Sequence, residues 1–358
     1  MFYVVIIAGG KGERFWPKSV RKIPKQFHRI TSEKTMLQET FSRVYPEVEK
    51  EQILVVANES QKPVILEQLG ELDERNLVLE PQGKNTAAAI ALAGLFINKK
   101  DPHATMAVLT SDHVLSPKSE FLRALNTAED VSEKGYLVTF GIRPCRPASE
   151  FGYIEIGERI SEFFGLEVFR VRSFREKPSP EEAEGFIREK RFFWNSGMFT
   201  FRVDVLFEAI RIYMPELYEG MKVIDRTLGT PRERDVMKDV FDGLESISID
   251  YGIMEKAKNI ACVIPEFSWD DVGSWGSLSR HLTKDEDGNI IDGKVVTMDS
   301  DNNIVLGDEE TLISLIGVRD MIVVKEGNRL LICHRDQDQR VKELLKKIAL
   351  RDDADEYL

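Results

Sequence analysis

Short runs of apolar residues recur along the first part of the chain, and longer segments with apolar residues at helical spacing separate them. Such continuous apolar runs are typical of strands that are buried on both faces of a sheet. Strands that are joined by helices form parallel sheets, so residues 1 to about 141 are predicted to form a doubly wound α/β half. The predicted strands read "FYVVII", "ILVVA", "NLVLE", "MAVLT" and "LVTFG".

The pattern changes between Gly152 and Phe201, where strand-like stretches are interrupted by one predicted helix after "KPSPEEAE". We expect these strands to form a mixed sheet that extends or caps the first half. A helical stretch from about Val203 to Lys258 follows, and then a further strand, "ACVIPEF".

The composition changes again beyond His281, where short β-branched pieces alternate with Gly, Asp and Asn, and the chain ends in an amphipathic helix, "DQRVKELLKKIAL". We therefore predict a domain boundary near residue 284, with a large α/β domain at 1–283 and a small β-rich domain with a terminal helix at 284–358. The apolar stripe of this tail serves equally well to pack against its own domain or to form a homodimer contact.

Composition narrows the classes of partner. The 358 residues are 42% hydrophobic and 31% charged, which is ordinary for a globular protein, but the formal net charge is −12. A negative surface repels polyanions, so neither nucleic acid nor an anionic membrane is expected as a partner. Any phosphate site must therefore be a local basic pocket.

The cysteines and the apolar runs bear on localisation. Cys145, Cys262 and Cys333 are odd in number and form no CxxC pair, which indicates neither a zinc site nor a disulfide framework. No basic leader precedes an apolar region, and the longest apolar run, "TAAAIALAGLFI", is too short to span a bilayer. These features predict a cytoplasmic protein.

The loop "AGGKGERF" directly follows the first predicted strand. A dinucleotide-binding GxGxxG motif would need a third glycine, but Phe15 occupies that position, and no P-loop string is present. An ordinary strand-to-helix turn remains the alternative to a loop whose N–H groups bind anionic oxygens. The clustering of cations favours polyphosphate binding, although each one alone is typical of a solvated surface: Lys11, Arg14, Lys18, Arg21, Lys22 and Lys25.

Carboxylates follow predicted strands at two places far apart in the sequence. Asp112, in "SDHV", ends the fourth strand, and the adjacent pair Asp270 and Asp271 lies in "SWDDVGSW". Mg²⁺ takes few protein ligands and completes its shell with water and phosphate, so one carboxylate from each place suits it, although each also suits a turn or a helix N-cap. His113 is expected to be structural, because no second histidine lies at ligand spacing.

Three further segments suggest sugar phosphate and anion binding. "FREKP" places Glu176 and Lys177 at the end of a strand, and "NSGMF" places Asn195 before another strand. A carboxylate and an amide suit sugar hydroxyls, and a lysine suits a phosphate, although turn chemistry also explains each. In "EPQGKNTAAAI", Asn85 or Thr86 is predicted to cap a helix whose N-terminus faces an anion.

Together these segments resemble one family. The strings "AGGKGERFWP", "PKQF", "EPQGKNTAAAIALA", "SDHV", "FGYI", "FREKP", "WNSGMFTF", "SIDYGIMEK" and "WDDVGSW" occur in the order found in the mannose-1-phosphate guanylyltransferases. The resemblance covers about residues 3–282 and implies a Rossmann-like α/β fold of the sugar-nucleotidyltransferase type, with a mixed sheet. The tail looks like the short left-handed β-helix of that family. The chain departs from the family pattern at Phe15, Lys84, Ala88 and Ser111.

The resemblance also implies an activity, which is transfer of GMP from GTP to mannose 1-phosphate, giving GDP-mannose and pyrophosphate by Mg²⁺-assisted in-line attack without a covalent enzyme intermediate. Arg14, Lys25 and Asp112 would be catalytic, with Asp112 and Asp271 binding Mg²⁺. Gly152, Glu176, Lys177 and Asn195 would bind the sugar phosphate. The nucleotide would be bound by Ala8, Gly9, Gly10, Gly12, Glu80, Gly83, Asn85 and Thr86.

Two alternatives stay open at this point. A noncatalytic regulatory subunit would keep the fold but is expected to lose cations or metal carboxylates that this chain retains. The same chemistry with another base or hexose is the nearer alternative. The resemblance gives no role to Asp250, Glu255 and Lys256, which fall in one of its motifs.

Overall fold

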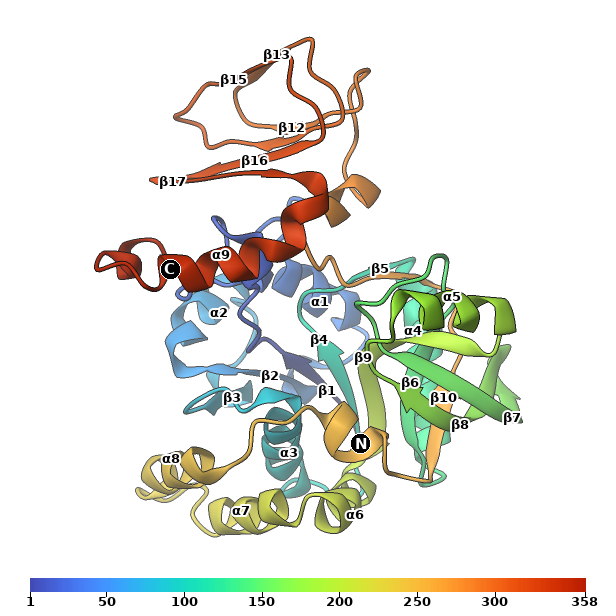
Figure 1. Ribbon diagram of the computed structural model, residues 1–358. Coiled ribbons are helices and arrows are strands. Elements are labelled where there is room, and N and C mark those ends of the chain that lie inside the picture. Colours follow the sequence, from blue (N-terminus) through green and yellow to red (C-terminus); the bar gives the residue numbers. More distant parts are fainter. The chain divides into compact units, whose positions relative to one another are not determined.

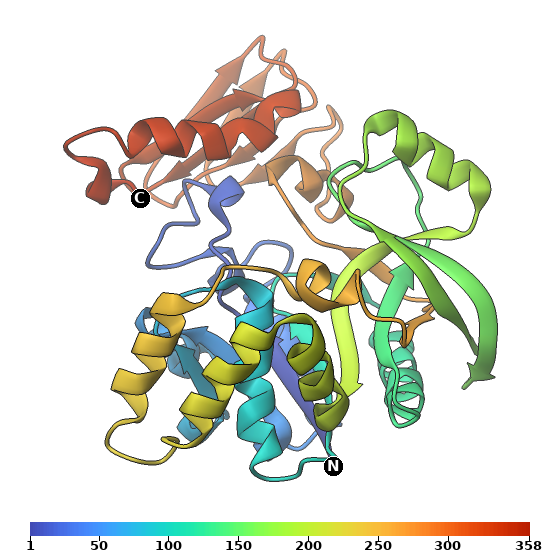
Figure 2. The same ribbon diagram turned by 60° about the horizontal axis from the view of Figure 1, so that its bottom comes forward.

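The computed structural model describes residues 1–358 and divides them into two compact units (Figures 1 and 2). Unit 1 comprises Met1–Gly9, Thr40–Lys62 and Leu69–Trp269. Unit 2 comprises Gly10–Glu39, Pro63–Gln68 and Asp270–Leu358, so early segments of the chain join the C-terminal part. The boundary predicted near residue 284 stays a prediction. None of the helices combines the length and the apolar character that a membrane crossing requires.

Unit 1 is built on one nine-stranded sheet of order β3-β2-β1-β4-β9-β6-β10-β8-β7. Its first four strands in this order are parallel, as the apolar runs predicted. All five strands predicted before residue 142 are confirmed: β1 (Phe2–Ile7), β2 (Ile53–Asn58), β3 (Leu77–Glu80), β4 (Thr105–Thr110) and β6 (Leu137–Ile142).

The later strands extend this sheet rather than cap it. β9 (Phe192–Arg202) is antiparallel to both of its neighbours, β4 and β6, and separates them. Beyond β6 come β10 (Ile260–Val263), β8 (Leu166–Arg175) and β7 (Tyr153–Phe163). The expected mixed sheet is therefore confirmed, with strands from the middle of the chain inserted into the doubly wound half.

One local expectation is wrong. Asn195 and Gly197 lie inside β9 and not before it. Gly197 has a φ of 68°, and the β6–β9 ladder shifts register between Thr139 and Gly141. This left-handed residue lets the strand continue through an irregularity, which turn-type residues in a sequence do not distinguish from a loop.

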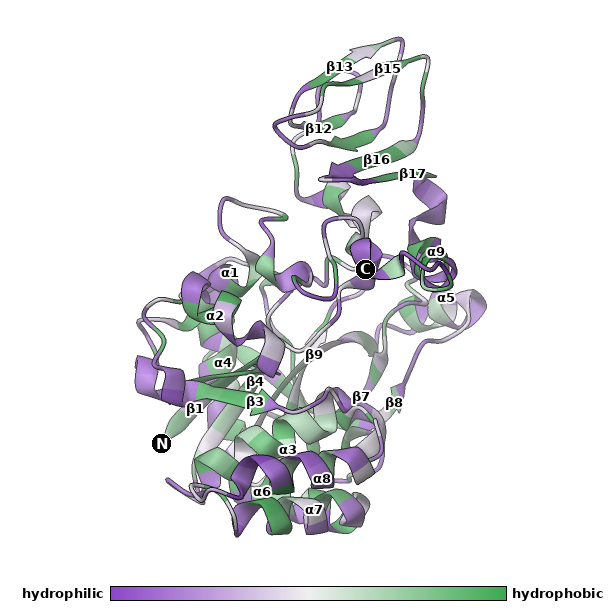
Figure 3. Cartoon of the chain, turned by 90° about the vertical axis from the view of Figure 1, so that its left-hand side faces the viewer, coloured by the Kyte–Doolittle hydropathy of each residue, from purple (hydrophilic) through white to green (hydrophobic).

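The apolar helix α3 (Asn85–Asn98) is buried along most of its length because it lies between the sheet and helices α6 (Val203–Tyr213) and α7 (Pro215–Asp225) (Figure 1). In Figure 3 the outer helices, with α8 (Glu233–Gly243), alternate between purple and green surfaces, as one-sided burial requires. The remaining elements of unit 1 are α4 (Lys118–Ser132), α5 (Pro180–Glu189), β5 (Val114–Ser116) and β11 (Ser268–Asp270), whose last residue belongs to unit 2. Helices α1 (Met36–Val44) and α2 (Lys62–Gln68) have residues in both units.

The β-rich tail of unit 2 stacks short strands in two ladders. β12 (Ile290–Asp292), β14 (Ile304–Leu306) and β16 (Met321–Glu326) are parallel neighbours, and β13 (Val295–Met298) pairs in parallel with β15 (Ile313–Ile316). Ile290, Ile304 and Ile322 stand in register and are buried. β17 (Arg329–His334) pairs antiparallel with β16 and ends the first ladder. The handedness of the coil stays a prediction.

Two buried asparagines hold consecutive turns of this coil together. Oδ1 of Asn289 accepts hydrogen bonds from the backbone N and from Nδ2 of Asn303, at 2.9 and 3.0 Å. Asn303 in turn donates to the carbonyl of Val318 and accepts from the N–H of Met321, both at 2.9 Å. Short strands leave many turn groups unpaired, and these amides satisfy them in the interior.

The terminal helix α9 (Val341–Ile348) packs within unit 2, close to the glycine-loop segment. Nε1 of Trp16 donates to the carbonyl of Tyr357 at 2.8 Å, and the N–H of Arg21 donates to the carbonyl of Leu358 at 2.6 Å. The C-terminal end of the chain therefore contacts the glycine-loop segment, and a homodimer contact through the apolar stripe stays a prediction.

We predict that Asn303→Ala lowers the stability of unit 2 by about 3 kcal/mol, because it removes the amide that joins the Asn289 side chain to the Val318 carbonyl and leaves the Met321 N–H without its partner. Thermal unfolding measured beside the exposed control Glu310→Gln checks this, together with hydrogen exchange over β14 and β16. An Asn303→Ala protein that melts with the control and keeps its exchange protection contradicts the prediction.

Candidate active site

The glycine loop of unit 2 has one glycine that the structure requires. Gly12 has a φ of 58°, and a Cβ there would overlap that of Lys25 and lie 2.8 Å from its backbone N. Nε2 of Gln26 also donates to the carbonyl of Gly10 at 3.0 Å. The loop is thus folded back onto the "PKQF" segment and is not an ordinary strand-to-helix turn.

Phe15, which occupies the third-glycine position of the dinucleotide motif, is an anchor of this loop. Its ring is buried and lies 4.7 Å from that of Trp275, centroid to centroid. Nε1 of Trp275 donates to the carbonyl of Trp16 at 2.9 Å. The aromatic pair fixes the loop that carries Arg14, whose half-buried guanidinium has no hydrogen bond or ion pair to another side chain.

Lys25 was expected to neutralise the triphosphate, and the structure adds a second role. Its side chain is buried, and Nζ donates to the carbonyls of Asp271 and Val272, both at 2.9 Å. The ammonium also lies 5.3 Å from the centre of the Phe15 ring. A buried cation needs such partners, and here they come from the loop that carries the candidate metal ligand.

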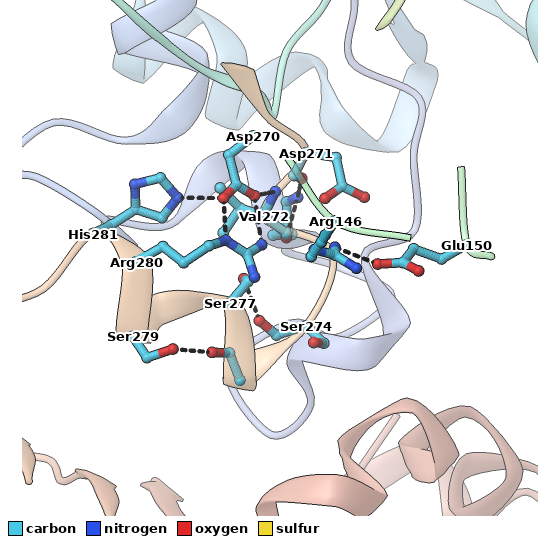
Figure 4. A network of polar contacts seen from close by, with 12 residues as sticks. Arg146, Glu150, Asp270, Asp271, Val272, Ser274, Ser277, Ser279, Arg280 and His281 are labelled. Atoms are coloured by element: carbon cyan, nitrogen blue, oxygen red, sulfur yellow. Dashed lines mark hydrogen bonds and ion pairs between the residues drawn. The ribbon is translucent and has the colours of Figure 1, made fainter. Parts of the chain in front are cut away.

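Asp271 lies in a loop whose shape is fixed by its neighbour Asp270 (Figure 4). Oδ1 of Asp270 accepts hydrogen bonds from Arg280 and from the N–H of Val272, both at 2.8 Å, and His281 Nε2 lies 2.9 Å from Oδ2. Burial alone would raise the pKa of Asp270, but hydrogen bonds from Arg280 and His281 hold that pKa well below its usual range.

This anchoring has a backbone consequence. Val272 is held at a φ of 45°, which is costly for a β-branched residue, and a Cβ at Gly273 would lie 2.8 Å from Oδ2 of Asp271. Of the two adjacent aspartates, Asp270 is therefore an anchor of the loop, and Asp271 is the partly exposed carboxylate that the loop presents.

In unit 1, Asp112 follows β4, as predicted, and its carboxylate is about a third exposed (34%). His113 is structural: Nδ1 accepts a hydrogen bond from Nε1 of Trp269 at 3.1 Å, and the two rings meet edge to face. Nε2 of His113 lies 4.0 Å from Oδ1 of Asp112. No group of three or more His, Cys, Asp or Glu side chains is placed to hold a metal ion.

Glu80 ends β3 beside the β1 end, where Ala8 donates its N–H to the carbonyl of Val56. The side chain is buried; Oε1 has no hydrogen-bond partner, and Oε2 lies 3.5 Å from where a Cβ at Gly9 would be. Burial raises the pKa of Glu80 from 4.5 to about 8. A buried carboxyl group with an unpaired oxygen and a raised pKa is a candidate for ligand binding.

The helix predicted from "EPQGKNTAAAI" begins differently from the expectation. Lys84 stands at the N-cap of α3 and donates no cap bond, and Asn85 has a φ of 68°. Oδ1 of Asn85 accepts the N–H of Thr86, whose hydroxyl accepts the N–H of Ile249 at 3.0 Å. The N–H of Ala87 donates to the Ile247 carbonyl, so segment 247–249 takes one of the donors that were predicted to face an anion. Gly83 precedes the helix, and a Cβ there would lie 3.8 Å from Oδ1 of Asn58.

The four predicted sugar-phosphate residues come together in unit 1. The N–H of Asn195 donates to the carbonyl of Gly152 at 2.8 Å, and Gly152 lies so close to Glu176 that a Cβ there would overlap Oε1. Lys177, at a φ of 44°, follows directly. Burial and the nearby Asp250 carboxylate raise the pKa of Glu176.

Sequence reasoning missed two members of this group. Asp250, which had no assigned role, accepts a hydrogen bond from Nδ2 of Asn195 at 2.7 Å. Thr139, a fully buried polar residue in β6, lies 3.3 Å from Oδ1 of Asn195. A threonine inside the apolar run "LVTFG" was the one signal in the sequence that a polar partner faces this strand.

Comparisons with known proteins bear on both parts of the chain. The nucleotidyl transferase family model matches residues 3–288, and the model of the MannoseP isomerase/GMP-like beta-helix domain matches residues 293–348. A mannose-1-phosphate guanylyltransferase of Escherichia coli is 35% identical over 354 residues, which cover 97% of this chain and 75% of that protein.

Two further relatives extend the similarity to other organisms. The xanthan biosynthesis protein XanB of Xanthomonas campestris pv. campestris is 37% identical over 349 residues, covering 96% of this chain and 72% of that protein. The crystal structure of a Thermus thermophilus protein, described as a mannose-1-phosphate geranyltransferase, is similar at a TM-score of 0.86 and 33% identity. The match covers 97% of this chain and 99% of the Thermus chain. The similarity thus spans the α/β part and the β-rich tail together.

The buried Glu80 predicts a pH-dependent stability. Between pH 4.5 and pH 8 the folded protein keeps the Glu80 proton that the unfolded chain releases, so this group makes the wild type less stable as pH rises through that window. Glu80→Gln removes the titration. We expect the variant to match the wild type below the window and to exceed its free energy of unfolding by up to about 4 kcal/mol above it.

Urea unfolding at pH 4.5 and pH 8.5 measures this difference, with the exposed Glu49→Gln as the matched control. A constant difference between Glu80→Gln and the wild type across the two pH values would show that Glu80 does not hold its proton in the folded state.

Proposed function

Since the chain belongs to the nucleotidyl transferase family, in the group of the mannose-1-phosphate guanylyltransferases, we propose that it transfers GMP from GTP to mannose 1-phosphate and releases pyrophosphate. The observation that carries the proposal is the sugar-phosphate group of unit 1. Lys177 supplies a cation beside an amide and carboxylates that suit hydroxyls, as a hexose phosphate requires. The similarity along almost the whole chain supports the choice of mannose and guanine.

The sugar phosphate is already an oxyanion at neutral pH, so its oxygen attacks the α-phosphorus without a general base or a covalent enzyme intermediate. Binding and charge neutralisation are then the contributions of the chain. Arg14, whose guanidinium is uncommitted, grips phosphate oxygens and opposes the charge that accumulates on pyrophosphate. Lys25 holds the Asp271 loop through its carbonyl contacts and adds positive charge.

The donor chemistry fits Mg²⁺. Asp112 in unit 1 and Asp271 in unit 2 each offer hard carboxylate oxygens, and an ion that keeps most of its shell as water and phosphate needs no third protein group. We propose these two aspartates as its ligands. When bound, Mg²⁺ neutralises phosphate charge and orients the phosphate oxygens.

Two features favour an enzyme over a regulatory subunit. The cations of the glycine loop and both candidate metal carboxylates are retained, and Arg14 is not tied up in structural contacts. Another base or hexose with the same chemistry is the alternative that the assay below tests. Cytoplasmic localisation and a homodimer stay predictions from the sequence.

The first prediction concerns substrates. Pyrophosphate release in the presence of Mg²⁺ is measured with GTP, ATP, UTP and dTTP, each combined with mannose 1-phosphate and with glucose 1-phosphate. We expect the fastest release from GTP with mannose 1-phosphate. A different best pair would refute the assigned base or hexose, and no release from folded protein with any pair would favour the regulatory subunit.

The second prediction concerns charge. Arg14→Ala, Lys25→Ala and Asp112→Ala should each slow turnover by about a hundredfold, because one lost contact to developing charge costs roughly 3 kcal/mol. Lys22→Ala, which removes an exposed cation from the same segment, should leave the rate unchanged. Any of the three variants that turns over at the rate of Lys22→Ala does not act in the mechanism.

A further inference from the structure

Asp250 begins a π-helical turn, Asp250–Met254, which directly follows segment 247–249. The turn is packed tightly, since a Cβ at Gly252 would overlap Sδ of Met214. Such single π turns are rare and recur at functional sites, because they displace one side chain from the helical path. Here the displaced segment brings Asp250 against β9, 55 residues away along the chain from its partner Asn195.

The hydrogen-bond partners of Asn195 identify which side-chain atom is the oxygen Oδ1 and which is the nitrogen Nδ2. The N–H of Gly197 can only donate, so the side-chain atom 3.3 Å from it must be the oxygen. The hydroxyl of Thr139 lies 3.3 Å from that same oxygen and 3.3 Å from the Met198 carbonyl. The opposite end, Nδ2, therefore faces Asp250 and donates to Oδ1 at 2.7 Å. One amide hydrogen of Asn195 is left for another acceptor.

The surrounding charges decide which acceptor that is. Burial raises the pKa values of Asp250, Glu176 and Glu255, and the charge of Asp250 is close enough to Glu176 and Glu255 to raise their pKa values further. Lys177 is the cation that offsets both Asp250 and Glu176. A phosphate would be repelled from the carboxyl side, whereas a hydroxyl donates to a carboxylate and accepts from an amide N–H.

We propose that Asp250 is a positioning residue for the hydroxyl end of the sugar-phosphate subsite, holding the Asn195 amide so that it offers a donor and not an acceptor to a hexose hydroxyl. The inference rests on the proposed function and extends it. It adds Asp250 behind Asn195, at the end of the subsite where Asn195 and Glu176 are proposed to bind hydroxyls.

Two variants separate this role from simple support of the fold. Asp250→Asn can present either end of its amide, so the contact with the Gly197 N–H is left to hold the orientation of the Asn195 amide without the carboxylate. Losing a hydrogen bond to a charged group predicts a KM for mannose 1-phosphate about tenfold higher, with the KM for GTP unchanged. The exchanged pair, Asn195→Asp with Asp250→Asn, restores the hydrogen bond between the two positions but reverses its direction.

The exchanged pair gives the decisive measurement. If Asp250 sets the orientation of the amide, the pair regains the melting temperature of the wild type while the KM for the sugar phosphate stays raised. A pair that regains both would make the contact merely structural and overturn the proposal. An unchanged KM for mannose 1-phosphate in Asp250→Asn would overturn it as well. Asp239→Asn, an exposed carboxylate on α8, is the matched control.

A third variant covers the case in which these proteins do not fold. Thr139→Val removes the hydroxyl that Oδ1 of Asn195 shares with the Met198 carbonyl, with almost no change of volume, and a raised KM for the sugar phosphate alone is expected. An unchanged KM in this variant counts against the proposal. The wild type separates a failure of the proposed function from a failure of the role of Asp250. Faster turnover with another hexose 1-phosphate would refute the assigned hexose, and the Asp250 variants would then be measured with that sugar. If calorimetry detects no sugar phosphate binding at all, both are overturned.

Discussion

The buried ammonium of Lys25 is the constraint on which the loops of unit 2 depend. A cation removed from water must be given oxygen atoms, and the chain supplies the carbonyls of Asp271 and Val272. Those carbonyls point at Lys25 only while the loop turns through Val272 in a left-handed conformation, which Asp270 and its partner Arg280 hold in place. Gly12 completes the set, because no side chain fits against Lys25 at that position.

This dependence explains why residues 10–39 belong to the same compact unit as the C-terminal segment. The rings of Phe15 and Trp275 pack at a tilt, and Trp16 contacts both Trp275 and Tyr357 through hydrogen bonds. The loop that carries Arg14 is therefore shaped by residues more than 250 positions further along the chain. A change in the tail is felt at this loop through packing within one unit.

The sequence predicted which strands form better than it predicted which strands pair with one another. Apolar runs identify β1, β2, β3, β4 and β6, because burial on both faces is a local property of a strand. The insertion of β9 between β4 and β6 is not local, and no periodicity records which strands will pair. Asn85 failed as a predicted cap for a similar reason, since backbone from segment 247–249 satisfies the start of α3 instead.

The candidate site shows the same division. Motif resemblance placed Gly152, Glu176 and Asn195 in one group, and the structure brings them together. It gave no role to Asp250, and it chose Asp271 as a metal ligand without giving a role to Asp270, because these roles depend on hydrogen-bond partners that only the folded chain defines. Thr139 was missed for a different reason. A single threonine in an apolar strand is common, because strands accept β-branched residues, so it does not by itself indicate a polar partner.

The protonation of Glu80 lowers the electrostatic repulsion that a polyphosphate would meet at the β1 end of unit 1. The chain carries twelve more acidic than basic side chains, and that formal charge counts Glu80 as an anion. With its pKa raised to about 8, the carboxyl is largely neutral in a neutral solution, so it adds no repulsion next to Gly9. Because the proton cancels the charge of Glu80, a polyphosphate near Gly9 would meet one negative charge fewer than the sequence suggests.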